Sequence, residues 1–207
     1  MAESLSYQLQ ANNLSCIRDD RVLFEALSFS LSVGQVLLLE GKNGSGKTSL
    51  LRILCGFREP DVGSLSWCGD AISDSSYIAD LAYVGHLEGV KKELTVYENL
   101  KVSLALGQAG HYSIMDALDR VNLTDYDEVL VQALSAGQKR RLSLARLLIT
   151  KNILWILDEP FTSLDRQGIE LIETLMSEHC AMGGMIVLTS HHDLSIQGVD
   201  VQRICLS

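Results

Sequence analysis

Short hydrophobic runs alternate with amphipathic stretches along most of the chain. Nearly continuous apolar runs of strand length lie at residues 36–40, 82–85, 153–157 and 185–188. Such runs predict strands that are buried on both faces, as they are in a parallel sheet. Hydrophobic residues at helical spacing predict helices between these strands, at residues 48–56, 138–150 and 167–176. The alternation of strands and helices predicts the α/β fold class.

Two regions depart from this alternation. At residues 5–14 and 27–33 hydrophobic and polar positions alternate, which predicts half-buried strands of an antiparallel β part. Residues from about 93 to 133 carry helical spacing without strand signals, and the predicted helix at 138–150 follows them. We therefore expect residues 1–207 to form a single domain, with a mixed sheet as its core and a helical insertion at about 93–150.

A glycine-rich turn follows the apolar run at residues 36–40 and precedes a predicted helix. Its residues are Gly41, Lys42, Asn43, Gly44, Ser45, Gly46, Lys47 and Thr48, in the pattern G-x-x-x-x-G-K-[ST]. The glycines let successive N–H groups face inward, and the helix start adds its positive end, so the turn is suited to bind phosphate. We expect Lys47 to contact the β- and γ-phosphates of a nucleotide and the Thr48 hydroxyl to bind Mg²⁺. A purely structural glycine turn would not require Lys47 and Thr48 at the helix start.

A pair of carboxylates ends the apolar run at residues 153–157. Because side chains alternate along a strand, Asp158 and Glu159 are expected to point in different directions. We assign Asp158 to Mg²⁺ and Glu159 to the general base that faces the attacking water, an arrangement that suits ATP hydrolysis. The alternative, a polar strand end before the turn at Pro160, is disfavoured by the phosphate-binding turn in the same chain.

A second helix start comes at residues 134–138, with the sequence LSAGQ. Ser135 is suited to cap the helix, and Gly137 permits a close approach of the backbone to a ligand. These two residues are compatible with an ordinary capped helix and equally with a second phosphate-binding helix start.

The motifs and their order resemble those of the ATPase subunits of ABC transporters. Residues 134–138 are similar to the LSGGQ signature of that family, with alanine at the third position, and residues 163–165 (SLD) are similar to its D-loop. His191 resembles the switch histidine of the family, and His192 beside it is the less favoured candidate. The resemblance covers about residues 5–206 and implies the P-loop NTPase fold of the ABC ATPase type.

The resemblance also implies how ATP is bound and hydrolysed. In this family a head-to-tail dimer holds ATP between the phosphate loop of one subunit and the signature helix of the other. Ser135, Gly137, Gln138 and Asp165 would then belong to the ATP site of the dimer. His191 would contact the γ-phosphate and orient the attacking water, so the expected cofactors are ATP and Mg²⁺.

Two positions depart from the family pattern. The aromatic residue that usually stacks on adenine, about 23 positions before the first loop glycine, is replaced by Arg18, whose guanidinium plane can also stack on a base. The glutamine that usually follows the strand at residues 82–85 is replaced by His86. Its imidazole can hydrogen-bond water or a phosphate and is assigned to the catalytic site; the alternative is that it only replaces a polar linker side chain.

The chain is most similar to one group within the family. Residues 85–100 and 154–165 resemble the ATPase subunit of haem exporters that serve cytochrome c maturation. This resemblance implies a membrane permease subunit as partner, a peripheral location on the cytoplasmic face of the inner membrane, and a cycle that releases a haem-carrying chaperone. The resemblance places the docking surface for the permease in the block that includes residues 85–86 and 88–95, where Lys91 and Lys92 are basic; alternatively, these two lysines only form a solvated turn.

Other functions are compatible with the same motifs. One is a soluble ABC-type assembly ATPase, such as one that serves iron–sulfur scaffolds, and another is the ATPase subunit of a different exporter. A nucleotide-gated binding module without enzymatic activity is a third class, but the carboxylate of Glu159 argues against it, because such a module does not need a hydrolytic base.

The composition of the chain narrows its possible functions and cellular locations further. The chain has 207 residues and a net charge of −9, which argues against nucleic acid as a partner. No apolar run approaches the ~18 residues that a membrane helix needs, and the first residues lack the basic and apolar regions of a signal peptide. The five cysteines include no C-x-x-C pair, which favours reduced thiols.

Overall fold

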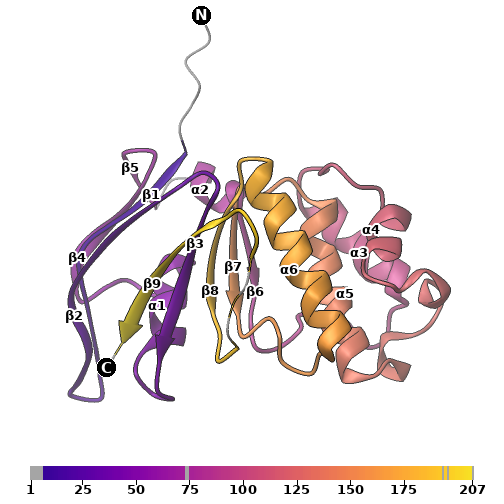
Figure 1. The fold of residues 1–207 in the computed structure, drawn as a ribbon, viewed down its shortest axis with the longest axis horizontal. Helices are drawn as coiled ribbons and strands as arrows, with labels where there is room; N and C mark the ends of the chain where they lie inside the picture. The colour runs from indigo at the N-terminus through magenta and orange to yellow at the C-terminus, as the bar shows by residue number, and fades with distance from the viewer. Residues whose placement is uncertain (1–6, 73–74, 193, 195, 207) are drawn as a thin grey trace, which may run out of the picture.

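The computed structural model of the protein describes residues 7–72, 75–192, 194 and 196–206, whose strands form one antiparallel and one parallel sheet (Figure 1). The strands are β1 (Gln8–Arg18), β2 (Arg21–Ser32), β3 (Gln35–Gly41), β4 (Val62–Trp67), β5 (Asp70–Ala71), β6 (Leu81–Val84), β7 (Leu154–Asp158), β8 (Met185–Thr189) and β9 (Asp200–Leu206). The α-helices are α1 (Lys47–Leu54), α2 (Ser75–Asp80), α3 (Val96–Leu106), α4 (Ile114–Arg120), α5 (Ala136–Ile149) and α6 (Arg166–Ala181), and two 3₁₀ turns are η1 (Thr124–Tyr126) and η2 (Val131–Ala133).

The parallel sheet has the strand order β6–β7–β8–β3–β9 and lies in the middle of the molecule, with the antiparallel sheet β2–β1–β4–β5 at one end and α3 to α6 at the other (Figure 1). Along β3, Val36 and Leu38 pack into the hydrophobic core that these helices cover. Leu37 and Leu39 pack into a second core, which α1 and the antiparallel sheet complete. Both faces of β3 are therefore buried, which is why its sequence is continuously apolar.

The predicted strands and helices are largely confirmed, with differences at the antiparallel part. β1 and β2 pair antiparallel as expected but are longer than predicted, and Leu5 and Ser6 lie outside the described residues. The prediction missed β4 and α2. Glycine and serine dilute the apolar pattern of β4, and its pairing with the distant β1 decides its conformation.

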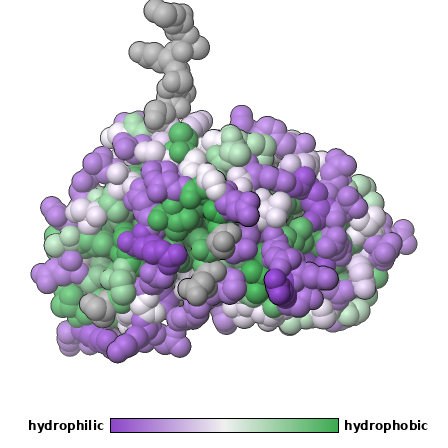
Figure 2. All heavy atoms as spheres, in the orientation of Figure 1, coloured by the Kyte–Doolittle hydropathy of each residue, from purple (hydrophilic) through white to green (hydrophobic). Residues whose placement is uncertain are grey.

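The chain between β6 and β7 forms α3, α4, η1, η2 and α5, and in this fully described stretch no strand of either sheet occurs. Capping boxes begin α3 at Thr95, α4 at Ser113 and α5 at Ser135, which explains where each helix starts. Hydrophilic side chains cover much of this helical end, whereas hydrophobic ones gather over the strands nearer the centre (Figure 2). None of the helices in the described part of the chain combines the length and the hydrophobicity of a membrane-spanning helix.

Candidate active site

The phosphate loop joins β3 to α1 at the carboxyl edge of the parallel sheet, where its strands end. Gly41, Gly44 and Gly46 have φ angles of 140°, 83° and 104°, in the region that disfavours other residues. A Cβ atom on Gly41 would lie only 2.3 Å from the carbonyl oxygen of Leu206 in β9, so a side chain there would clash with the neighbouring strand. α1 begins at Lys47 without a side-chain cap, which leaves its first N–H groups for an anion.

Two buried polar groups of this loop fit a bound phosphate. The Lys47 Nζ atom donates hydrogen bonds to the carbonyl oxygens of Gly41, at 2.6 Å, and of Lys42, at 3.3 Å. The Ser45 Oγ atom is buried and has no hydrogen-bond partner within the described residues. An ammonium held only by carbonyl groups and an unpartnered hydroxyl are the groups that a phosphate can satisfy.

The two carboxylates at the end of β7 face different partners, as predicted. Asp158 is buried and accepts hydrogen bonds from Thr48 Oγ1, at 3.3 Å, and from Thr189 Oγ1, at 2.8 Å. Glu159 Oε1 lies 3.5 Å from His191 Nε2. The Glu159 side chain is 24% exposed and that of His191 is 59% exposed, so both remain accessible to a substrate.

The backbone at Glu159 is unusual for a residue other than glycine. Its φ angle of 50° lies in the left-handed region, which persists only where the surroundings hold it. The Glu159 N–H group donates to Thr189 Oγ1 at 2.9 Å. Such strain at a strand end is often found in functional sites, and here it directs a carboxylate away from the strand toward a histidine.

These groups meet at one open cleft of about 840 Å³. Its lining residues are Arg18, Asp19, Arg21, Leu23, Lys42, Asn43, Gly44, Gly46, Lys47, Thr48, Ser49, His86, Asp158, Glu159, Thr162 and His191. Segments far apart in the sequence therefore converge here, including the exposed His86 after β6. Gly41 and Ser45 complete the phosphate loop but are not among the lining residues.

Arg18 reaches the cleft from the turn of the β1–β2 hairpin. Asp19 and Asp20 in this turn have φ angles of 50° and 60°, as in two-residue hairpin loops of the primed type. The Arg18 side chain is 60% exposed, and its Nε atom lies 3.5 Å from Asp19 Oδ2. Arg18 thus has an exposed ion pair and is among the residues that line the cleft.

The remaining predicted residues lie away from the cleft. Ser135 and Gln138 form the capping box of α5, with the Gln138 N–H group donating to Ser135 Oγ at 3.2 Å. At Gly137 of the same helix, a Cβ atom would lie 2.9 Å from the Ser163 carbonyl oxygen. Asp165 caps α6 by accepting a hydrogen bond from the Gly168 N–H group at 2.8 Å. A single copy of the chain therefore does not bring these residues to the phosphate loop.

Sequence reasoning missed two residues that organise the site. Thr189 ends the apolar strand β8, and its register opposite Asp158 explains why its hydroxyl meets that carboxylate. Arg140 in α5 is 4% exposed and donates hydrogen bonds to backbone carbonyl groups at the ends of β6 and β7. Burial lowers the pKa of Arg140, and attraction to the carboxylates of Glu88, Asp158 and Glu159 opposes that shift. For Thr189 the available signal was a polar residue at the end of an apolar strand. For Arg140 the sequence contained no such signal.

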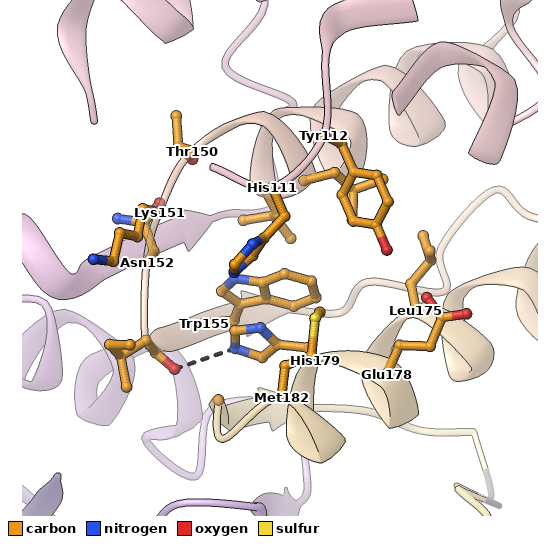
Figure 3. A pocket seen from close by; sticks show the side chains of 14 residues that line it. His111, Tyr112, Thr150, Lys151, Asn152, Trp155, Leu175, Glu178, His179 and Met182 are labelled. Carbon is orange, nitrogen blue, oxygen red and sulfur yellow. Dashed lines mark hydrogen bonds between the residues drawn. The ribbon is translucent and has the colours of Figure 1, made fainter. Parts of the chain in front are cut away.

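A second cavity, of about 80 Å³, lies at the amino edge of the parallel sheet (Figure 3). His179, near the end of α6, stacks on Trp155 with ring centroids 3.7 Å apart and an angle of 8° between the rings. Its Nε2 atom donates to the Ile153 carbonyl oxygen at 3.1 Å. Burial lowers the pKa of His179 to about 4, so the ring is neutral at pH 7. None of the predicted site residues lines this cavity.

Comparison with known proteins assigns the family. The family described as ABC transporter matches residues 24–162, which include the phosphate loop, the signature helix and both carboxylates. The chain belongs to the ABC transporter family. A putative ABC transporter ATP-binding protein from Pyrococcus furiosus has a solved structure that superposes with a TM-score of 0.83 at 25% identity, covering 96% of this chain and 97% of that one. The predicted ABC ATPase fold is confirmed.

Relatives within the ABC family are similar over nearly their whole length. The cytochrome c biogenesis ATP-binding export protein CcmA of Methylococcus capsulatus is 50% identical, covering 96% of this chain and 98% of the relative. The protein of the same name from Vibrio vulnificus (strain YJ016) is 45% identical over the same shares. The chain therefore belongs to this group of ABC ATP-binding proteins, and the predicted subfamily is confirmed.

Proposed function

We propose that this chain hydrolyses ATP as the energy-supplying subunit of an inner-membrane ABC complex for cytochrome c biogenesis. The observation that carries the proposal is the meeting of the phosphate loop, Asp158, Glu159 and His191 at one cleft. Similarity to cytochrome c biogenesis ATP-binding export proteins supports the choice of pathway.

ATP binds with its phosphates on the loop between β3 and α1. The Lys47 ammonium exchanges its carbonyl partners for the β- and γ-phosphates, and the first N–H groups of α1 complete the anion site. The Arg18 guanidinium covers the base from the hairpin turn. Thr48 and Asp158 would hold Mg²⁺ through a hydroxyl and a carboxylate oxygen, which are ligand types that this ion prefers. When bound, Mg²⁺ neutralises charge on the phosphates.

Hydrolysis depends on the pair formed by Glu159 and His191. Glu159 accepts a proton from the attacking water while the bond between the γ-phosphorus and the bridging oxygen breaks, and ADP and phosphate leave. His191, whose Nε2 atom is 3.5 Å from the Glu159 carboxylate, orients that water and the γ-phosphate. His86 contacts the same water or the phosphate from the end of β6.

The first test is Glu159→Gln in the purified chain. Loss of a general base lowers the rate of ATP hydrolysis by about 10²–10⁴-fold, whereas ATP binding remains, because the phosphate loop is unchanged. Glu170→Gln is the matched control, since Glu170 lies on α6 and is paired with Arg166 outside the cleft. A Glu159→Gln variant that hydrolyses ATP at the wild-type rate would refute the assignment of the base.

Two copies of the chain enclose ATP between the phosphate loop of one and the signature helix of the other. The position of Ser135, Gly137, Gln138 and Asp165 away from the cleft supports this arrangement, because only a second copy could present them to the phosphates. Glu159→Gln should therefore elute as a dimer in gel filtration with ATP and as a monomer without it. Adding Ser135→Arg to the Glu159→Gln variant should abolish the dimer. The shared ATP site would be refuted if Glu159→Gln stays monomeric with ATP and the membrane complex also forms no ATP-dependent cross-links between two copies.

The permease subunit docks on an apolar groove between the end of α1, α2 and α3. Phe57, Ile78 and Leu106 are large hydrophobic side chains that are 67%, 64% and 86% exposed, and a group of such side chains around a groove marks an interaction site. Leu106 lines a hollow of about 620 Å³, Phe57 lines a second one of about 570 Å³, and Ile78 lines both. Lys91 also lines the first hollow, which supports docking of the permease at this surface. A helix on the cytoplasmic side of the permease fits this groove and holds the chain on that face of the membrane.

Fractionation of cell extract tests the docking surface. The wild-type chain should sediment with membranes, and Leu106→Asp should shift it to the supernatant. Met115→Asp is the matched control, because Met115 on α4 is also exposed but lines neither hollow. Equal sedimentation of both variants would place the contact elsewhere.

A deletion strain that carries Lys47→Ala tests the pathway. It should lack haem-stained c-type cytochromes, because the complex cannot hydrolyse ATP and does not release its haem-carrying chaperone. Normal c-type cytochromes in that strain would exclude a role in cytochrome c biogenesis. They would not exclude ATPase activity, which is measured separately in vitro.

A further inference from the structure

Arg140 buries a guanidinium group behind the active site without forming an ion pair in the described part of the chain. Its Nε atom donates to the Pro160 carbonyl oxygen at 3.0 Å, and Nη1 donates to that of Gly85 at 2.8 Å. Nη2 donates to the carbonyl oxygens of Asp158 and Glu159, both at 2.8 Å. One side chain of α5 therefore binds the backbone of the two segments after β6 and β7, which carry His86 and Glu159.

These hydrogen bonds hold the backbone on both sides of Glu159. Arg140 binds the carbonyl oxygen of the peptide group before the Glu159 Cα atom and that of the peptide group after it. Thr189 Oγ1 accepts the hydrogen bond of the Glu159 N–H group. With both peptide planes fixed, the left-handed conformation at Glu159 is held, and with it the direction in which the carboxylate leaves the backbone.

Arg140 also connects this backbone to the start of α5. Ser135 caps the same helix, and Arg140 lies in the first turns after it. At Gly137 the helix backbone closely approaches the carbonyl oxygen of Ser163, so α5 meets the segment after β7 at a second point. α5 therefore contacts the segment after β7 at two points, through Gly137 and through Arg140.

We propose that Arg140 is a positioning residue for hydrolysis, which sets the direction of the Glu159 carboxylate and couples it to the signature helix. This inference rests on the proposed function, specifically on Glu159 as the general base. Arg140 itself is not among the residues that line the cleft. It should therefore affect kcat and leave the binding of ATP unchanged.

The test is Arg140→Lys, with ATP hydrolysis measured on the full chain in its membrane complex. Lysine keeps the charge but cannot reach four carbonyl groups at once. Because a small misplacement of a reacting group can cost about 10²-fold in rate, we expect kcat to fall by up to about 10²-fold. KM should stay within about twofold, the range of independent effects. Arg141→Lys is the matched control, since Arg141 donates to the carbonyl oxygens of Val121 and Asn122, away from the cleft.

A double-mutant cycle with Glu159→Gln separates positioning from general damage. If Arg140 acts through Glu159, Arg140→Lys should lower the residual rate of Glu159→Gln by no more than about twofold. The same loss in both backgrounds, a rise in KM, or an unchanged kcat would overturn the proposal. Failure of both Arg140→Lys and Arg140→Gln to fold would also overturn it, because Arg140 would then serve the fold. If the single variant Glu159→Gln hydrolyses ATP at the wild-type rate, Glu159 is not the general base, and the proposed function fails rather than the role of Arg140.

Discussion

The two edges of the parallel sheet are built in opposite ways. At the carboxyl edge, Asp158 and Glu159 line an open cleft, and Glu159 adopts a left-handed backbone conformation. At the amino edge, His179 is buried, stacked on Trp155 and hydrogen-bonded to the Ile153 carbonyl group (Figure 3). The same strand, β7, contributes to both environments, although only five residues long.

The difference shows where this fold keeps groups available for chemistry. Open α/β sheets bind ligands at the carboxyl ends of their strands, where loops and helix starts provide N–H groups and polar side chains. The amino edge instead buries its ionisable ring in the neutral form, which contributes to stability. Substitutions at the carboxyl edge should therefore change activity far more than stability, and substitutions at the amino edge should do the reverse.

The largest effect is expected for Lys47→Ala at the carboxyl edge. Loss of a preorganised charge that stabilises the transferring phosphoryl group costs at least about 10²–10³-fold in rate, so ATP hydrolysis should be abolished in practice. Unfolding by urea should hardly change, because the hydrogen bonds of Lys47 to Gly41 and Lys42 are local ones within its own loop. Lys151→Ala, at the amino edge, is the control and should keep the wild-type rate. If Lys47→Ala hydrolyses ATP at a near-normal rate, the loop between β3 and α1 does not bind the phosphates as proposed.

The next effect concerns stability and pH at the amino edge. The pKa of His179 is about 4 in the folded protein and ~6.5 in an unfolded chain. The contribution of the neutral His179 ring to the free energy of unfolding is therefore complete above pH ~6.5. It is lost as the pH falls toward 4, because the unfolded chain binds the proton first. The shift corresponds to about 3 kcal/mol of unfolding free energy between pH 7 and pH 4.

Urea unfolding of His179→Gln measures this contribution. The wild type should lose more unfolding free energy than the variant over the same pH range, by about 3 kcal/mol. His111→Gln is the control, because His111 is an exposed histidine at the same cavity and should leave the wild-type pH dependence in place. If the unfolding free energies of wild type and His179→Gln change equally with pH, His179 does not make the predicted contribution to stability at the amino edge.

The smallest effect is expected for Arg18→Ala, at the rim of the carboxyl edge. If the guanidinium stacks on the base, the affinity for ATP should fall by roughly 0.5–2 kcal/mol, the magnitude of a cation–π contact. Binding of tripolyphosphate, which has no base, should not change. Equal affinities of Arg18→Ala and wild type for ATP, measured by calorimetry, would mean that Arg18 does not cover the base.

The sequence was most informative where local chemistry and burial agree. The strands that are buried on both faces, the phosphate loop and the Asp158–Glu159 strand end were all predicted, because each has a short-range signature. β4 was missed because serine and glycine obscure its pattern, and its strand conformation depends on pairing with β1. Arg140 was missed because nothing in a helical sequence shows which side chain will meet the carbonyl groups of distant loops.

The sequence by itself determined which groups are available for the proposed chemistry: a glycine-rich turn before a helix start, a hydroxyl and a carboxylate that are suited to Mg²⁺, and a carboxylate and a histidine that are suited to act on water. These depend on residue type and on spacing along one strand or one turn. Only the tertiary structure decided which of them meet. The parallel register places Thr189 opposite Asp158, and the loop after β8 brings His191 near Glu159. It also leaves Ser135 and Asp165 away from the cleft, because contacts between distant segments follow from packing, which no local pattern encodes.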